Sequence, residues 1–219
     1  MQQLSTEVAT SLKQGWKLAR PFFTPEMVVK ANGQTILLWV TSRKFPALLA
    51  RGPYAGGKSA VVAPVGPDLK MVTGAAKLIR DHGADRAQYA ALRSAPLAQG
   101  KVLLADGGKY RYSKTVLAVV FDSQRRTSAS IITQAIRSSA EIASTAGCTS
   151  LIVPDITANL VVQSNWITES QRESAASVAA AATVAGILAC RATMATYHIW
   201  CWDPANAADY KRELSRIRS

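Results

Sequence analysis

Short apolar runs of strand length alternate along this chain with longer segments of helical periodicity, and this alternation restricts the fold more than any other feature. The runs are rich in β-branched and aromatic residues, which favours strands. They span Thr35–Val40, Ala60–Val65, Lys101–Ala105, Thr115–Phe121, Ser150–Val153 and Thr196–Trp202. Strands that alternate with helices predict an α/β fold, here a three-layer α/β/α sandwich around a mixed, mostly parallel sheet.

The helical segments carry apolar residues at spacings of three and four and end at recognisable stop signals. Gly83 and Gly147 follow two of them, and Asp68 occupies the N-cap position before the first. Asp203 and Pro204 supply a cap and a first-turn proline for the last helix. The other predicted helices cover Leu69–His82, Asp85–Leu92, Thr127–Ala146 and Thr168–Arg191.

The chain divides into a short arm and one larger domain. Residues 5–19 fit an amphipathic helix that stops at Pro21 and Pro25, so residues 1–34 are predicted to form an N-terminal helical arm. Residues 35–219 then form the α/β domain. The longest uncharged run, Ser174–Cys190, is mostly alanine and is too weakly apolar for a membrane span. We expect a buried helix there and no membrane partner.

Positive charge is concentrated in the first part of the chain. The net charge is +12, and residues 1–126 hold 19 Lys and Arg against 7 Asp and Glu, whereas residues 127–219 hold 7 against 7. A basic surface of this kind favours RNA or an acidic protein surface as partner, and dispersed lysines that only maintain solubility are the alternative. The candidate polyanion-binding residues are Arg43, Lys44, Arg51, Lys58, Lys109 and Arg111.

Three cysteines without a close pair indicate neither a disulfide framework nor a zinc site. We therefore expect an intracellular, reducing compartment, either the cytoplasm or a virion, and an organelle is the open alternative. No metal or cofactor is expected.

One stretch fits the phosphate-binding pattern G-x-x-x-x-G-K-[ST]. It runs from Gly52 to Ser59 in the sequence RGPYAGGKSAVV. A working loop of this type must open directly into a helix, whereas Ser59 leads into β-branched residues and Pro64. The strand that ends at Asp122 matches the form of a magnesium-holding partner strand, but two pattern matches do not make a site. We interpret the loop as a basic surface turn.

No catalytic group of residues emerges from the sequence. His82 is placed at a helix end and His198 in mid-strand, where structural roles are favoured. Cys201 is three residues after His198, which places the two side chains on opposite faces of a strand. We therefore predict a protein without catalytic activity.

Three segments resemble the macro domain, the α/β/α module that binds ADP-ribose. AVVAPVGPDLKMVTGAAKLIRDHG resembles that family's strand, asparagine turn, glycine-rich loop and first helix. GKVLLADGGKYRYSKTVLAVVFD resembles its central strand pair, and TSLIVPDITANLV resembles its strand and second phosphate loop. The resemblance covers residues 35–217 and implies a macro-domain-like fold.

The resemblance fails at the positions that carry the family's chemistry. The turn asparagines fall on Ala63 and Gly66, the glycine triplet on Val72–Gly74, and the second loop on Thr157–Asn159. Side chains at glycine positions restrict φ and hinder close approach of a pyrophosphate. The resemblance therefore implies a degenerate module that does not hydrolyse ADP-ribose and binds it weakly or not at all. Its candidate ligand residues are Gly66, Asp68, Gly74, Asp155, Thr157, Asn159 and Trp202; Trp200 is the second aromatic of that region.

Three functions stay open. The first is a non-catalytic, macro-domain-like protein that binds RNA or another phosphate-rich partner through its basic first part. The second is a structural subunit of a large assembly, such as a viral shell or a ribonucleoprotein particle. The third is residual binding or hydrolysis of ADP-ribose.

Overall fold

The structure is a computed structural model that describes residues 25–31, 33–40, 58–81, 84–107, 114–156, 169–190, 194–201 and 203–218. The predicted helix over residues 5–19 and most of the glycine-rich loop lie outside these ranges.

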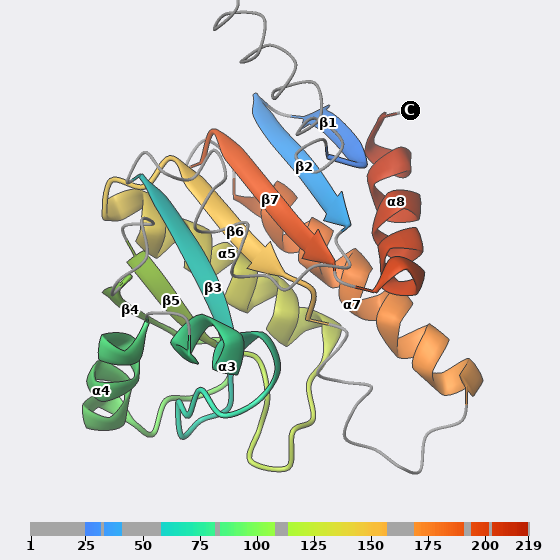
Figure 1. Cartoon of the computed structure of the whole chain (residues 1–219). Coiled ribbons are helices and arrows are strands. Elements are labelled where there is room, and N and C mark those ends of the chain that lie inside the picture. Colours follow the sequence, from blue (N-terminus) through green and yellow to red (C-terminus); the bar gives the residue numbers. More distant parts are fainter. Residues whose placement is uncertain are drawn as a thin grey trace, which may run out of the picture.

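The described strands form one seven-stranded sheet in the order β1-β2-β7-β6-β3-β5-β4 (Figure 1). Strands β2, β7, β6, β3 and β5 run parallel, and β1 and β4 run antiparallel at the two edges. This confirms the mixed, mostly parallel sheet that the alternation predicts. The strands are β1 (Met27–Ala31), β2 (Gln34–Val40), β3 (Ser59–Val65), β4 (Val102–Asp106), β5 (Lys114–Val119), β6 (Ser150–Pro154) and β7 (Thr196–Cys201).

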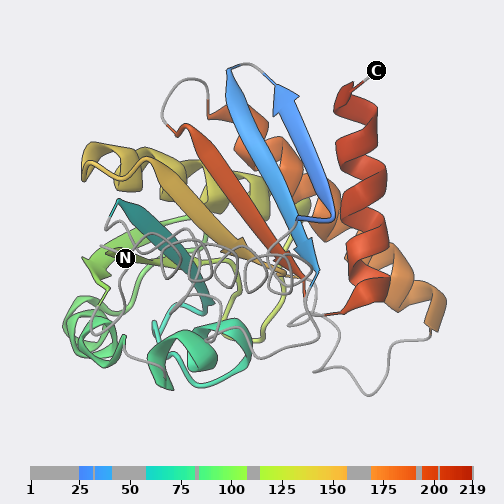
Figure 2. The same cartoon turned by 45° about the horizontal axis from the view of Figure 1, so that its top comes forward.

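Helices cover both faces of the sheet, which gives the three layers (Figure 2). One face carries the short helices α3 (Gly74–Asp81) and α4 (Asp85–Ser94). The other carries the longer helices α5 (Ala129–Thr145), α7 (Glu169–Ala189) and α8 (Pro204–Arg218). Among the described helices, none is both long enough and apolar enough to cross a membrane.

Two helix starts carry a side-chain cap, and the one at Asp203 is predicted from the sequence. Ser128 is the N-cap of α5, and its hydroxyl accepts a hydrogen bond from the amide of Ile131. Asp203 precedes α8, and its carboxylate accepts one from the amide of Ala205. A side-chain oxygen at this position satisfies an amide that has no partner inside the helix.

Residues 27–31, which the sequence analysis places in the N-terminal helical arm, form strand β1 instead. It pairs with β2 from Met27↔Leu38 to Ala31↔Gln34. The sequence holds a signal for this hairpin, the dipeptide Asn32-Gly33, which is common in tight turns that need positive φ. Gly33 has φ +76°.

The helix predicted over Leu69–His82 begins later, at Gly74. Leu69 adopts a left-handed backbone with φ +56° and is fully buried. Asp68 is therefore not an N-cap; its carboxylate accepts a hydrogen bond from the amide of Lys70, two residues on. The apolar spacing of Leu69 and Met71 reflects burial of a loop, which the periodicity alone cannot distinguish from a helix.

Candidate functional site

A cleft of about 380 Å³ lies at the carboxyl ends of β3 and β5. Open α/β sheets bind ligands at this edge, in the crevice that the loops after the strands form. The polar groups that line the cleft come from two loops, one after each strand. They are Gly66, Asp68, Lys70 and Thr73 on the first loop, and Asp122, Ser123 and Arg125 on the second.

The first loop is held by a turn and by helix α4. The amide of Leu69 donates to the carbonyl of Gly66 at 2.9 Å, which closes the turn. The amide of Met71 donates to Oε1 of Gln88 on α4 at 2.6 Å, and Nε2 of Gln88 donates to the carbonyl of Leu69. With the side chains of Leu69 and Met71 fully buried, this wall of the cleft is fixed to the core.

Gly74 begins α3 with φ +53°, a conformation in which glycine has no Cβ penalty. It is the one glycine retained at the triplet position of the family pattern. Gly66 differs: a Cβ there would lie 3.6 Å from Oδ1 of Asp68, an ordinary contact. Gly66 lines the cleft, but the fold does not demand glycine at that position.

The second loop is a tight turn around Asp122. One carboxylate oxygen accepts hydrogen bonds from the amides of Gln124 and Arg126, both at 2.8 Å, and the other accepts from Nε of Arg126. The amide of Arg126 is the main cause of the lowered pKa of Asp122. Asp122 is thus engaged by its own loop, and the described residues contain no group of three acidic, histidine or cysteine side chains that could hold a metal.

Arg125 joins the two walls of the cleft. Its backbone has φ +63°, which is uncommon outside glycine. Its Nη1 donates to the hydroxyl of Thr73 at 3.1 Å. On the opposite wall Lys70 lies 3.4 Å from Asp68, and both side chains are more than half exposed. The cleft therefore presents two cations at its rim, each held by a partner that leaves other donors free for a ligand.

Asp155 does not line the cleft. Its side chain is fully buried, and its Oδ2 accepts a hydrogen bond from Nδ2 of Asn206 on α8 at 2.7 Å. The charge of Asp155 contributes, after burial, to the raised pKa values of Cys201 and Tyr210. The prediction that Asp155 faces a ligand is wrong; it anchors α8 to the end of β6.

The aromatic residue Trp200 belongs to the core. It is 1% exposed and stacks on Trp39 with ring centroids 6.1 Å apart. Nε1 of Trp39 donates to Nδ1 of His198 at 3.1 Å. Burial lowers the pKa of His198 to about 3, so the imidazole is neutral at pH 7. These residues stabilise the sheet, and Trp200 offers no surface to a base.

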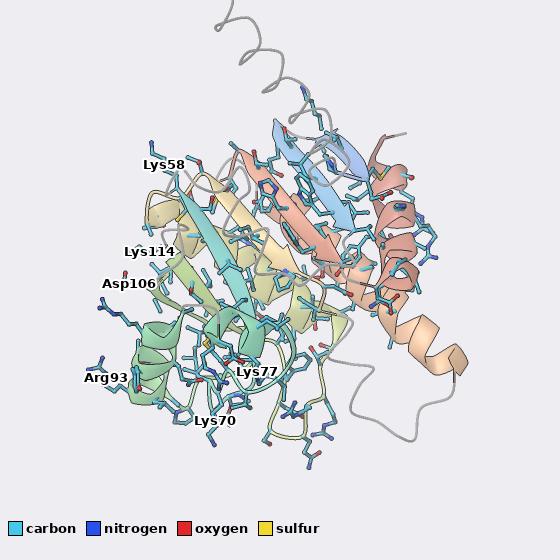
Figure 3. The ribbon with its side chains drawn as sticks, viewed as in Figure 1. Lys58, Lys70, Lys77, Arg93, Asp106 and Lys114 are labelled. Carbon is cyan, nitrogen blue, oxygen red and sulfur yellow. The ribbon has the colours of Figure 1, made fainter. Side chains whose placement is uncertain are left out.

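Lys58 lies at the amino end of β3, the end opposite to the cleft (Figure 3). Ser59 begins the strand and its hydroxyl is 2.7 Å from that of Ser150. In a nucleotide-hydrolysing loop, the serine at this position would hold the magnesium ion and lie at the start of a helix, whereas Ser59 is a buried strand residue. The G-x-x-x-x-G-K-[ST] match therefore leads into a strand and not into the helix that such a loop requires.

Several predicted site residues lie outside the described ranges. They are Thr157, Asn159 and Trp202 of the ligand set, and Arg43, Lys44, Arg51, Lys109 and Arg111 of the polyanion set. Sequence reasoning missed Lys70, Thr73, Ser123 and Arg125, because the cleft is formed by loops whose packing no local pattern shows.

Neither the protein-family models nor the curated proteins gave a match to this chain. The comparison with solved structures did give matches. A variant of the Oceanobacillus iheyensis macrodomain is 13% identical with a TM-score of 0.66, over 88% of this chain and 97% of that one.

The same bacterial macrodomain with ADP is 14% identical, with a TM-score of 0.64, and covers 88% of this chain and 96% of its own. The Trypanosoma brucei macrodomain in complex with ADP-ribose is 13% identical, with a TM-score of 0.56, over 81% of this chain and 68% of its own. At such low sequence identities, the similarity shows a shared fold. This chain has the macro domain fold, a three-layer α/β/α sandwich, as the three resembling segments implied.

Proposed function

We propose that this chain is a non-catalytic binding module for a phosphate-rich ligand of the nucleic-acid class, held by cations of its first part. One observation carries the proposal: the two parts of the chain treat their positive charges differently. Among described side chains after residue 126, every Lys and Arg forms an ion pair with a carboxylate, namely Arg137, Lys211, Arg212 and Arg216. Before residue 127, five described cations also form ion pairs with aspartates, namely Lys70, Lys77, Arg80, Lys114 and Arg126. Six others form no ion pair within the described ranges: Lys30, Lys58, Arg86, Arg93, Lys101 and Arg125.

Cations without carboxylate partners favour a polyanion. A surface ion pair contributes little to stability, so the missing partners cost the fold little. A phosphate backbone supplies the missing negative charge, and binding releases its condensed counterions. These six side chains are therefore available for a phosphate-rich ligand at low cost.

The chemistry of the described residues supports binding without catalysis. His198 is buried and neutral at pH 7, and burial raises the pKa of the Cys190 thiol to about 11. At the cleft, Asp122 has a lowered pKa and is bonded within its own loop. A general base works best with a pKa near the operating pH, and Asp122 is shifted in the opposite direction.

The test is fluorescence anisotropy of a labelled single-stranded RNA of about 20 nucleotides titrated with the full chain at increasing salt. Contact with about four phosphates predicts that affinity falls about 50-fold between 50 and 200 mM salt. Absence of binding at the lower salt would contradict the proposal. A salt-insensitive self-assembly of the protein, seen by light scattering, would instead support the structural-subunit alternative.

The cleft favours a second candidate, binding of an ADP-ribose-type nucleotide. Its volume of about 380 Å³ falls within the range of small-molecule sites, about 300–1,000 Å³. Lys70 and Arg125 would face the phosphates. Calorimetric titration with ADP-ribose should then show heat that Arg125→Ala abolishes, whereas no heat at millimolar ligand would exclude this candidate and leave the first untouched.

A further inference from the structure

Helix α4 packs through small side chains and exposes its large ones. Ala84, which precedes the helix, and Ala87 and Ala91 within it are fully buried against the sheet side. Gln88 fixes the loop at Met71, as described above. The helix is therefore anchored on its inner side, and its outer side carries Arg86, Tyr89, Leu92 and Arg93.

Three of these residues lie close together on the outer side. Arg86, Tyr89 and Arg93 are spaced by three and four residues, which places them along one face. The two arginines are separated by about 10 Å along the helix axis, with the tyrosine between them. Tyr89 is 66% exposed, and Figure 3 shows Arg93 directed away from α4 and from the sheet.

The charge of this face is not neutralised by the described residues around it. Neither Arg86 nor Arg93 forms an ion pair with any described carboxylate. Helix α8 on the opposite face of the sheet offers the contrast: Arg212 pairs with Asp209 and Glu213, and Arg216 pairs with Glu213 at 2.8 Å. Two surface helices of one molecule thus differ in whether their arginines have partners.

We infer that the face formed by Arg86, Tyr89 and Arg93 binds single-stranded nucleic acid, with a base stacked on the tyrosine ring and phosphates on the two guanidinium groups. This inference rests on the proposed function and locates part of its surface. Positively charged surfaces with exposed aromatic rings bind single strands, because unpaired bases expose a π-face to stack. The bases of a duplex are already stacked on one another, so the tyrosine would add nothing to duplex binding.

An acidic protein is the competing occupant. It would satisfy the arginines, but it gives no reason for a highly exposed aromatic ring between them. The two occupants differ in what the ring contributes, which makes Tyr89 the discriminating residue.

The charge test compares two double variants of the full chain that lose the same charge. In Arg86→Gln with Arg93→Gln, the slope of log K against log salt for single-stranded RNA should shrink by about 1.4, because two phosphate contacts are lost. Arg212→Gln with Arg216→Gln should leave the slope unchanged, because those side chains already have carboxylate partners. Circular dichroism checks that both variants are folded.

The ring test separates stacking from charge. Tyr89→Ala should weaken binding of single-stranded RNA by about fivefold or more, whereas Tyr89→Phe keeps the ring and should bind like the wild type. Binding of duplex RNA should be the same in all three proteins. Equal losses for single-stranded and duplex RNA, or none, would overturn the assignment of stacking to Tyr89.

The outcomes separate the two claims. A wild-type chain that binds no RNA at low salt overturns both the proposed function and this inference. A wild-type chain that binds RNA while the α4 double variant binds equally well overturns the inference alone, and places the ligand on other cations of the first part.

Discussion

The two helical layers of this sandwich differ in length, packing and charge. Helices α5, α7 and α8 are 17, 21 and 15 residues long and cover the larger of the two cores. Helices α3 and α4 have 8 and 10 residues and cover the smaller one. The first layer pairs its described surface cations with carboxylates, and so does α3 in the second layer. Helix α4 instead leaves two arginines without a described ion-pair partner. Within the described residues, the difference in charge between the two layers therefore lies in α4.

The substitution with the largest expected effect on stability is at Gly186, where α7 packs on α5. A Cβ at Gly186 would lie 2.8 Å from the carbonyl oxygen of Thr133 and 2.9 Å from Cβ of Ile136. Gly186→Ala should therefore cost about 3 kcal/mol through overpacking, which outweighs the gain of about 1 kcal/mol in helix propensity. Urea denaturation should show a net loss of roughly 2 kcal/mol in the free energy of unfolding.

Ala185, the exposed residue next to Gly186, provides the control. Ala185→Gly at this site should lose only about 1 kcal/mol, from helix propensity alone. If Gly186→Ala were as stable as the wild type, the tight α5–α7 contact, and with it the contrast between the layers, would be contradicted. RNA affinity of the folded variant should not change.

The second effect is a dependence of stability on pH. It comes from His198, which lies on the face of the sheet that also carries α3 and α4. The folded-state pKa of His198 is lowered to about 3, against about 6.5 in the unfolded chain. Between these values the unfolded chain binds the extra proton, so stability is fully present above about pH 6.5 and falls as the pH falls toward 3. At pH 5.5 the loss should be about 1.4 kcal/mol relative to pH 8.

His198→Asn isolates this effect, because the asparagine oxygen can still accept the hydrogen bond from Trp39. The variant should show a flatter dependence of the free energy of unfolding on pH between 8 and 5.5. The carboxylates with lowered pKa, Asp81 and Asp122, titrate below that window. Parallel curves for the wild type and His198→Asn would show that the imidazole is not held neutral by burial.

The smallest expected changes in stability concern the arginines of α8 and α4, which differ in whether they have ion-pair partners. Arg212→Gln removes pairs with Asp209 and Glu213 and should cost at most about 1 kcal/mol, as surface ion pairs do. Arg86→Gln removes no pair with a described residue and should leave the free energy of unfolding unchanged. A loss for Arg86→Gln as large as that for Arg212→Gln would mean that the α4 arginine has a structural partner.

The alternation of apolar runs and amphipathic segments predicted six of the strands, the helical segments and the mixed sheet, because burial of one face leaves a periodic pattern in the sequence. The site was less predictable. Asp155 was expected at the cleft and is buried with Asn206, since a strand-end carboxylate has the same pattern whether it faces a ligand or a neighbouring helix. Arg125 could not be found, because its place depends on a left-handed turn and on Thr73, 52 residues away.

Lysine acetylation in the presence and absence of single-stranded RNA, read by mass spectrometry at low salt, shows whether RNA contacts the cations that have no described carboxylate partner. Lys58 and Lys101 form no described ion pair, whereas Lys211 pairs with Glu26 at 3.1 Å. RNA should slow acetylation of Lys58 and Lys101 and leave that of Lys211 unchanged. Equal protection of all three lysines, or protection of Lys211 alone, would contradict this prediction.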